Sequence, residues 1–486
     1  MRAISRRHAL LLGGFGVAAT AAGGAGLLLT LTPREKPVTG GDLAQPPEER
    51  SSNGRLQVQL EAAPGQIMLA GQQAAALGYN GRIPGPTLRI QPGDVLRIRL
   101  VNNLPQATNL HVHGLHVSPK GSGDNPFVSV DPGDAFDYEY KLPLDHPPGV
   151  YWYHPHHHGT VADQIFAGLF GAIIVEDPAP IEASVERVLV ISDTTLDSLG
   201  NIAAIPDMER TMGREGDLIL VNGQSNPQLS ARPGQRERWR IINACVTRYL
   251  RLRLDDQQLQ LIGVDSGRFP TPKPLAELIL TPGNRADLLV TTATGDSVLR
   301  ALYQDRGTME AMMRPGRGPR SPADQSNGTA LATLHVTGEP VASLPSVPLQ
   351  KVPGDLRAAP LATRRRIALA TGMTMSGGSM SFTINGKKFD QTRTDTTVLA
   401  GDVEEWTLTN ASPMDHPFHL HIWPMQIINE NGHDNDQVIW QDVVNVPANG
   451  QMTVRIAFKD FSGRSVYHCH ILDHEDLGMM GAIEVR

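Results

Sequence analysis

The chain contains the stretch Pro92-Gly93-Asp94-Val95-Leu96-Arg97-Ile98-Arg99-Leu100-Val101-Asn102, in which a Pro-Gly turn precedes a strand of alternating apolar and polar residues. The same pattern recurs at residues 233–243 and again at residues 400–410. An Asn-Gly pair, a strong turn signal, precedes each copy, at residues 80–81, 222–223 and 385–386. The copies lie a whole domain apart, far beyond the roughly 20–50 residues of a solenoid repeat, so the sequence predicts three related β-domains.

Composition and connecting segments agree with an all-β chain divided into domains. The 486 residues include 48 Gly and 37 Pro, which suits many short strands joined by turns, and 40% hydrophobic residues exclude a disordered chain. Pro-rich connections at residues 177–180 and 339–360 mark the expected boundaries. We therefore predict a signal at residues 1–32, a flexible tether at 33–54, and β-domains at 55–178, 179–340 and 341–486.

Charge and cysteine content exclude two classes of protein. Lys and Arg number 43 against 50 Asp and Glu, a net charge of −7, and no long basic run occurs, so nucleic-acid binding is not expected. The two cysteines, Cys245 and Cys469, permit at most one disulfide, which excludes a disulfide-stapled scaffold. Nothing in the sequence indicates an obligate protein partner.

The first residues predict export. Ser5-Arg6-Arg7 precedes an uncharged stretch, residues 9–32, that is rich in Ala, Gly and Leu, as in a twin-arginine signal. We expect the twin-arginine export machinery to deliver the folded protein to the periplasm or the cell exterior. Cleavage near Ala19-Thr20-Ala21 and retention as a membrane anchor both fit this stretch, and an ordinary soluble N-terminus with a chance arginine pair is the alternative.

The 17 histidines are distributed very unevenly along the chain. In a strand, residues i and i+2 face the same side, so a His-x-His pair presents two imidazoles together. One such pair on an exposed strand is usually only surface, but four pairs in two related domains indicate metal binding. The pairs are His111/His113, His154/His156, His419/His421 and His468/His470. The middle domain contains only His335 and is expected to be a spacer without metal.

Cys469 indicates which metal is bound. It lies at the centre of the last His-x-His pair, so on a strand its sulfur points away from both rings, toward His416, His474 and Met479. A cysteine thiolate with two histidines and a weak methionine is the blue-copper electron-transfer set. A small buried apolar cysteine is the ordinary alternative, and zinc would not explain a mononuclear site joined covalently to a separate eight-histidine cluster. We therefore expect redox-active copper.

These segments resemble those of the three-domain multicopper oxidases, the family that contains laccases, bacterial copper-efflux oxidases and spore-coat laccases. The resemblance covers roughly Leu56 to Arg486 and rests on His111-Val112-His113-Gly114, His154-Pro155-His156, His416-Pro417-Phe418-His419-Leu420-His421, and His468-Cys469-His470 followed by His474 and Met479. It implies three cupredoxin-like Greek-key β-sandwiches and four copper ions, one of type 1, one of type 2 and two of type 3. By resemblance, His416, Cys469, His474 and Met479 hold type 1, His111 and His419 hold type 2, and His113, His154, His156, His421, His468 and His470 hold the type 3 pair.

The resemblance also implies the reaction, in which one-electron oxidation of a reductant is coupled to four-electron reduction of O2 to water. Carboxylates near the cluster are expected to relay protons, because the histidines are occupied by metal. The candidates are Glu475, next to His474, and Asp124, in the loop after the first His pair; for Asp124 a solvated loop carboxylate is the alternative. A thioether at Met479 implies a lower type 1 potential than in fungal members that have a non-ligating residue there.

The sequence leaves the reductant open between two classes. Phenols and aromatic amines would fit a laccase-like oxidase, whereas Cu(I) or other metal ions would fit a role in copper homeostasis. The long Met-rich insert of copper-efflux members is missing, and the methionine clusters at residues 309–313 and 373–380 are only weak support for Cu(I). The alternative from a different class is an exported cupredoxin-fold copper-binding or scaffold protein without turnover, which the complete ligand set disfavours.

Overall fold

The computed structural model describes residues 40–307, 328–373 and 380–486. The chain separates into two compact units, Met1–Pro37 and Val38–Arg486, and every described residue belongs to the second. The predicted twin-arginine signal therefore lies outside the described residues, as do Met309, Met312, Met313 and Met375. Regular structure in the described part is almost entirely β-strand, which confirms the all-β prediction.

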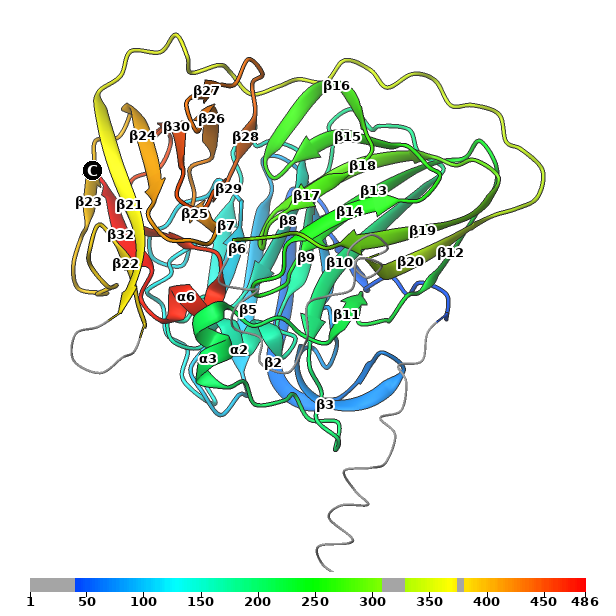
Figure 1. Cartoon of the computed structure of the whole chain (residues 1–486), viewed down its shortest axis with the longest axis horizontal. Helices are drawn as coiled ribbons and strands as arrows, with labels where there is room; N and C mark the ends of the chain where they lie inside the picture. The colour runs from blue at the N-terminus through cyan, green and yellow to red at the C-terminus, as the bar shows by residue number, and fades with distance from the viewer. Residues whose placement is uncertain (1–39, 308–327, 374–379) are drawn as a thin grey trace, which may run out of the picture. The chain divides into compact units, whose positions relative to one another are not determined.

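The first group of strands forms two sheets from residues 48–175 (Figure 1). The five-stranded sheet has the order β1 (Glu48–Arg50), β4 (Thr87–Ile90), β9 (Gly171–Val175), β8 (Gly149–His154) and β6 (His111–His113). The four-stranded sheet has the order β3 (Gln72–Tyr79), β2 (Arg55–Leu69), β5 (Val95–Asn102) and β7 (Ala135–Lys141). The short helix α2 (Val161–Phe166) follows β8.

The middle group also consists of two sheets, which residues 185–336 form. Its six-stranded sheet has the order β11 (Leu218–Val221), β10 (Val185–Thr194), β13 (Arg236–Asn243), β18 (Arg285–Thr291), β15 (Leu259–Val264) and β16 (Gly267–Leu275). Its five-stranded sheet has the order β12 (Gln228–Ala231), β20 (Thr329–Val336), β19 (Gly295–Leu302), β14 (Leu250–Leu254) and β17 (Leu278–Leu280). Helix α3 (Asp207–Met212) lies in the connection between β10 and β11.

The third group comprises residues 363–485. The larger sheet has the order β22 (Met380–Ile384), β21 (Thr363–Met373), β24 (Val403–Asn410), β30 (Gln451–Ala457), β26 (Met425–Glu430) and β27 (His433–Asp434), with β28 (Trp440–Gln441) also paired to β26. The smaller sheet has the order β23 (Thr396–Val398), β32 (Met480–Val485), β31 (Gly463–Cys469), β25 (His416–Leu420) and β29 (Val443–Val446). Helix α6 (Leu472–Asp476) follows β31.

The repeated stretch occupies an equivalent position in each group. Its three copies form β5, β13 and β24, and each pairs in parallel with the first long strand of its group, β2, β10 or β21. Each copy also pairs antiparallel with a later strand, β7, β18 or β30. The groups fall in the order of the three predicted domains, and the boundaries at residues 178 and 340 stay predictions.

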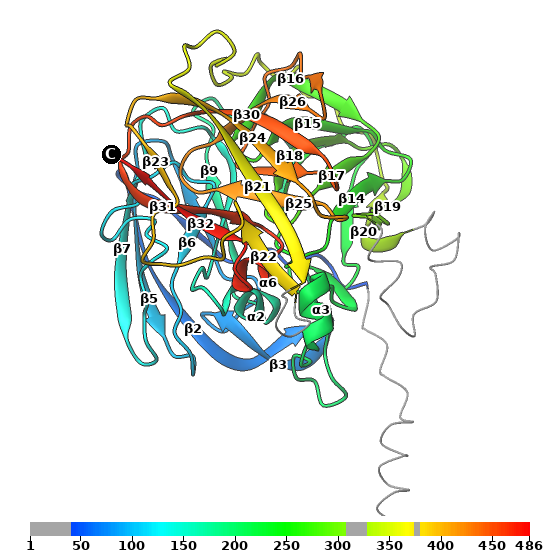
Figure 2. The ribbon, with the colours of Figure 1, turned by 60° about the vertical axis from the view of Figure 1, so that its left-hand side comes forward.

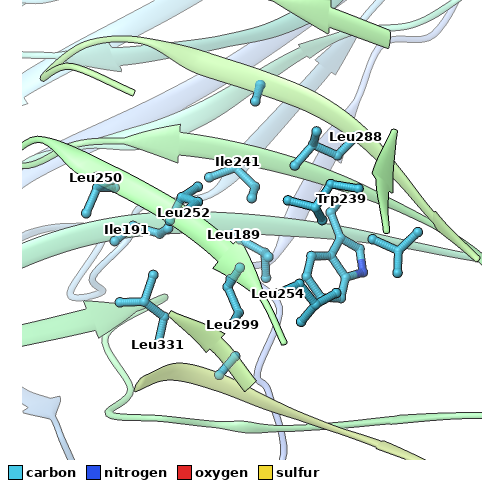
Figure 3. Packing of buried hydrophobic residues seen from close by; sticks show 14 of the residues in the cluster. Leu189, Ile191, Trp239, Ile241, Leu250, Leu252, Leu254, Leu288, Leu299 and Leu331 are labelled. Atoms are coloured by element: carbon cyan, nitrogen blue, oxygen red, sulfur yellow. The ribbon is translucent and has the colours of Figure 1, made fainter. Parts of the chain in front are cut away.

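The two faces of the middle copy, β13, pack against different cores. Trp239 and Ile241 lie in the core between the two middle sheets, where Leu252 and Leu299 face them (Figure 3). Ile242 instead belongs to a core shared with Trp152 of β8. Burial on both faces explains why β13 lacks the alternating exposure of β5. It also places the middle group directly against the strand that carries His154.

Part of the expected flexible tether is ordered, which corrects that prediction for the segment near residue 50. Strand β1 adds in parallel to the edge of β4, with Glu48 opposite Thr87. Arg89 donates from Nε to Glu48 at 2.8 Å, and this ion pair helps to hold the segment on the sheet. A polar composition suggested a linker, but an extended polar segment can still satisfy its backbone by pairing with a sheet edge.

Helices α2, α3 and α6, one from each group, lie side by side in both views (Figures 1 and 2). In the part of the chain that the structure describes, no helix combines the length and apolar character that crossing a bilayer would require.

Candidate metal centre

All eight histidines of the four His-x-His pairs meet in one buried cluster. The first group provides four of them, from β6 and from the end of β8 and the residues just after it, and the third group provides four, from β25, β31 and the residue that follows each of these strands. Each is at most 2% exposed. Antiparallel pairing sets the contacts, because His111 lies opposite His154 in one sheet and His419 opposite His468 in the other.

The ring nitrogens converge in three places. His111 Nε2 lies 3.4 Å from His419 Nε2, and His113 Nδ1 lies 3.4 Å from His154 Nε2. His468 Nε2 lies 3.1 Å from His156 Nε2 and 3.2 Å from His421 Nε2. Two nitrogens that share a metal at about 2 Å each can be no more than about 4 Å apart, so each cluster of nitrogens fits one ion.

The second nitrogen of several rings is held by the protein. Nδ1 of His111 donates to Asp124 at 2.9 Å, and Nε2 of His113 donates to Asp442 at 3.0 Å. Nδ1 of His419 donates to the carbonyl oxygen of Asp442 at 2.7 Å. Such a bond fixes the ring and its tautomer, and leaves the other nitrogen with a lone pair for a metal.

Burial favours the neutral, metal-binding form of His154 and His156. It lowers the pKa of His154 to about 3 and that of His156 to about 4, and neighbouring histidines add to the effect. Neither ring nitrogen of His470 has a hydrogen-bond partner among the described residues. A fully buried imidazole without partners is costly, and a metal ion bound at one of its nitrogens would supply the missing partner.

A second donor set lies in the third group beside the cluster. Cys469 Sγ lies 3.3 Å from His416 Nδ1 and 3.9 Å from His474 Nδ1, and Met479 is fully buried in the same core. The opposite nitrogens are held, since His416 Nε2 donates to Ser412 Oγ and His474 Nε2 to the carbonyl oxygen of Thr211. Burial raises the pKa of the Cys469 thiol well above its usual value, so a bound metal is needed to make it a thiolate.

The two candidate carboxylates both lie at the cluster, in different surroundings. Asp124 is 1% exposed, which contradicts the solvated-loop alternative, and it also accepts from the backbone N–H of Val112. Burial raises the pKa of Asp124 to about 8. Glu475 has an oxygen 3.0 Å from His468 Nδ1 and another 3.4 Å from His156 Nε2. Apart from these two contacts, its oxygens have no hydrogen-bond partner among the described residues.

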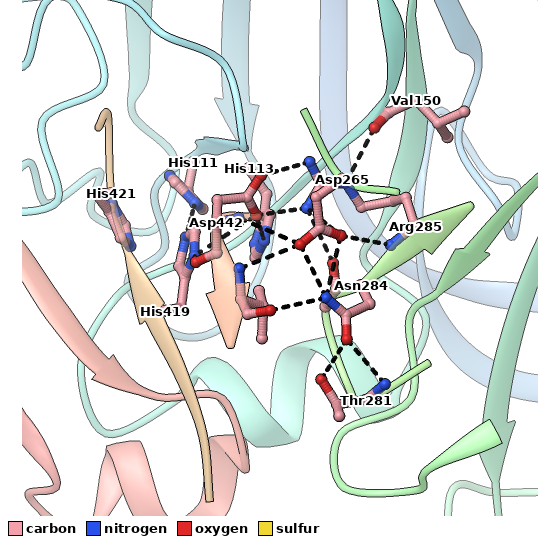
Figure 4. A network of polar contacts seen from close by, with 12 residues as sticks. His111, His113, Val150, Asp265, Thr281, Asn284, Arg285, His419, His421 and Asp442 are labelled. Atoms are coloured by element: carbon pink, nitrogen blue, oxygen red, sulfur yellow. Dashed lines mark hydrogen bonds and ion pairs between the residues drawn. The ribbon is translucent and has the colours of Figure 1, made fainter. Parts of the chain in front are cut away.

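A network of polar contacts that the sequence did not predict reaches the cluster from the middle group (Figure 4). Arg285 donates to both oxygens of Asp442, the carboxylate that accepts from His113. Asp265 accepts from the backbone N–H groups of Arg285 and Asp442. The middle group, expected to be only a spacer, therefore supports the ring positions, and no histidine pattern could have indicated this.

The glycine of the first His-x-His-Gly motif, Gly114, is the one sequence feature that could have indicated this network. Gly114 has φ +85°, and a Cβ there would lie 2.2 Å from Arg285 Nη2 and 2.9 Å from Asp442 Oδ2. Gly114→Ala is expected to destabilise the protein by about 1–3 kcal/mol or more, because it adds backbone strain and displaces the ion pair. Thermal unfolding should show this, with Gly121→Ala as the control, since Gly121 also has positive φ but nothing within 4 Å. Equal losses in both variants would contradict the close approach.

The remaining cysteine plays no part in the site. Cys245 is a free, buried thiol in the core of the middle group, and Cys469 is also free.

Comparisons with known proteins agree along nearly the whole described chain. Three multicopper oxidase family models match residues 61–180, 186–338 and 364–486. The multicopper oxidase mco of Staphylococcus haemolyticus is 28% identical, with 90% of each chain covered, and the cell division protein FtsP of Escherichia coli is 28% identical, with 86% of each covered. A solved structure described as a multicopper oxidase from Campylobacter jejuni, a metallo-oxidase, is 32% identical and covers 92% of this chain and 95% of its own, with a TM-score of 0.80.

Proposed function

Because the chain belongs to the multicopper oxidase family, we propose that it couples one-electron oxidation of a reducing substrate to four-electron reduction of O2 to water. The observation that carries the proposal is the convergence of eight buried histidines beside a separate Cys-His-His set. The donors suit copper, since neutral imidazoles and a thiolate are its preferred protein ligands.

Four coppers can be assigned to these donors. We assign the type 1 ion to His416, Cys469, His474 and Met479, the type 2 ion to His111 and His419, and the type 3 pair to His113, His154, His470 and to His156, His421, His468. The three foci of converging nitrogens support this division for seven of the eight histidines, all but His470. The unpartnered ring of His470 lies next to that of His113, with ring centres 5.0 Å apart.

Bound copper would supply the redox chemistry, and the chain supplies position, insulation and protons. Cys469 joins the two sites covalently, because its backbone neighbours His468 and His470 both belong to the cluster. Water formation consumes four protons with four electrons. We propose Glu475 as the group that delivers protons, since its buried oxygens contact His156 and His468 and have no other hydrogen-bond partner among the described residues. Asp124 already accepts a hydrogen bond from His111. We therefore propose that its main role is to orient that ring and that proton relay is a secondary role.

Stoichiometry provides the test of this function. With a one-electron reductant in excess, four equivalents should be oxidised for each O2 consumed, and no hydrogen peroxide should accumulate. An oxygen electrode with a peroxide assay measures both quantities. Accumulation of peroxide at two equivalents per O2 would contradict a four-electron site.

The reductant is proposed at the level of two classes, phenols or aromatic amines on one side and Cu(I) or other metal ions on the other. The Campylobacter jejuni protein that this chain resembles is described as a metallo-oxidase, which favours a metal ion. The side chains of His416, Cys469, His474 and Met479 are all fully buried, and Thr211 of α3 covers the outer nitrogen of His474. A covered site favours a small reductant, so turnover of Cu(I) should exceed that of a phenol when the two are compared on one preparation.

The second candidate function is a copper-binding or scaffold protein without turnover. The similarity to the cell division protein FtsP, whose name describes no oxidase, supports this candidate. A ligating residue is present at every ligand position, which argues against this function. Copper-loaded protein that consumes no O2 with any reductant would establish it.

We also propose export through the twin-arginine route on the sequence of Ser5-Arg6-Arg7 alone. Changing both arginines to lysine should retain the protein in the cytoplasm, as fractionation would show.

A further inference from the structure

The middle group carries two buried arginines that each contact both of the other groups. Arg285 is fully buried, and Arg214 is 2% exposed. Within the described residues, neither side chain forms a hydrogen bond or ion pair with a proposed copper ligand. Arg285 is linked to such ligands through Asp442, beside the eight-histidine cluster. Arg214 binds Asp473, which precedes the proposed ligand His474 beside the cysteine site.

Arg285 joins the first and third groups beside the eight-histidine cluster. Its Nε donates to the carbonyl oxygen of Val150 in β8 at 3.0 Å, and its Nη2 donates to Asp442 at 2.7 Å (Figure 4). Asp442 accepts in turn from His113 of the first group and, through its carbonyl, from His419 of the third. Through Asp442, the guanidinium of Arg285 therefore positions one histidine of the first group and one of the third.

Arg214 makes the corresponding connection beside the cysteine site. Its Nη1 donates to Asp163 of α2 at 2.6 Å, and its Nε donates to Asp473 of α6 at 3.0 Å. Its backbone N–H also donates to Asp473 at 3.0 Å. Asp473 directly precedes His474. The adjacent positions of α2, α3 and α6 in Figures 1 and 2 reflect this contact.

We propose that Arg285 and Arg214 are positioning residues, through which the middle group sets the distance between the first and third groups at the proposed copper sites. A cluster divided between two groups binds metal well only if its donors are placed to within about 0.5 Å. A guanidinium that binds a carboxylate through two nitrogens fixes both distance and angle, which a point charge cannot do. Buried ion pairs add little net stability, so precise placement is the better explanation of these two.

Ordinary adhesion between groups is the competing explanation, and the chain offers a matched control. Arg238 of β13 is 3% exposed and donates to Asp287 at 2.9 Å from Nε and 2.6 Å from Nη2. Strand β13 pairs with β18, which begins at Arg285. Arg238 therefore matches Arg285 in burial and ion pairing, but in the described part of the chain its partners Asp177 and Asp287 form no hydrogen bond or ion pair with a histidine of the cluster.

The test compares Arg285→Met, Arg214→Met and Arg238→Met in the full-length protein loaded with copper. The measurements are copper content, chelator competition, the blue absorption, the electron paramagnetic resonance spectrum, and unfolding of the metal-free form. Arg285→Met should weaken retention of the type 2 ion about 10–100-fold and alter its resonance signal, with the blue absorption unchanged. Arg214→Met should shift the blue absorption and leave the type 2 signal unchanged, and Arg238→Met should change neither.

The outcomes separate this inference from the proposed function on which it rests. If all three variants lose similar thermal stability while both copper signals stay as in the wild type, the arginines only join the groups and the inference is wrong. If Arg285→Met does not fold, Arg285→Lys replaces it; lysine keeps the charge without the two-point contact, so an unaltered type 2 signal in that variant would overturn the inference. Failure of the wild-type protein to bind copper would instead overturn the proposed function.

Discussion

Cys469→Ser is expected to abolish the blue absorption, reduce oxidase turnover to background and lower the copper content from about four ions per chain to about three. The serine hydroxyl is a hard, weakly acidic donor that cannot replace the thiolate beside His416 and His474. The eight-histidine cluster lies outside this change and should keep its metal. Elemental analysis, the absorption spectrum and oxygen uptake on one preparation check the three parts of this prediction.

Cys245→Ser is the matched control for that experiment. Both cysteines are free and at most 1% exposed, but Cys245 lies in the core of the middle group, away from the histidines. Its replacement should leave colour and turnover unchanged. Blue colour that persists in Cys469→Ser, or disappears in Cys245→Ser, would contradict the assignment of the type 1 site.

The sequence predicted the donor set because strand geometry is local. The alternation of side chains brings His111 and His113 to one face, and the same rule sends Cys469 away from its neighbours. The repeated stretch predicted three groups of strands for the same reason, since a turn and an alternating strand are encoded within a few residues. The boundaries of these elements did not need to be known for either prediction.

The parts that could not be predicted depend on long-range contacts. Arg285 and Asp442 are 157 positions apart, and neither lies in a distinctive pattern. The composition of residues 33–54 also did not indicate that β1 would pair with the edge of β4. Asp124 was ambiguous for a related reason, because only the fold shows that the loop after β6 returns its carboxylate to His111.

Glu475→Gln is expected to lower kcat by about 10²–10⁴-fold while copper content and blue absorption stay at wild-type levels. Glutamine has nearly the same size, but it cannot accept and release the protons that water formation requires. The carboxylate is fully buried and lies 3.0 Å from His468 Nδ1, where bulk water cannot replace it. Steady-state oxygen uptake at saturating reductant measures the effect.

The neighbouring Asp476 provides the control that separates proton delivery from structure. Its oxygens accept from the backbone N–H groups of Gly159 and Ala162 at the start of α2, so Asp476→Asn should cost about 1 kcal/mol of stability with little effect on kcat. Reduction of the blue colour by substrate without O2 needs no proton at the cluster and should proceed normally in Glu475→Gln, whereas reoxidation by O2 should be slow. Equal slowing of both half-reactions would show that Glu475 supports the site only structurally, because a group that serves water formation alone has no reason to affect entry of electrons.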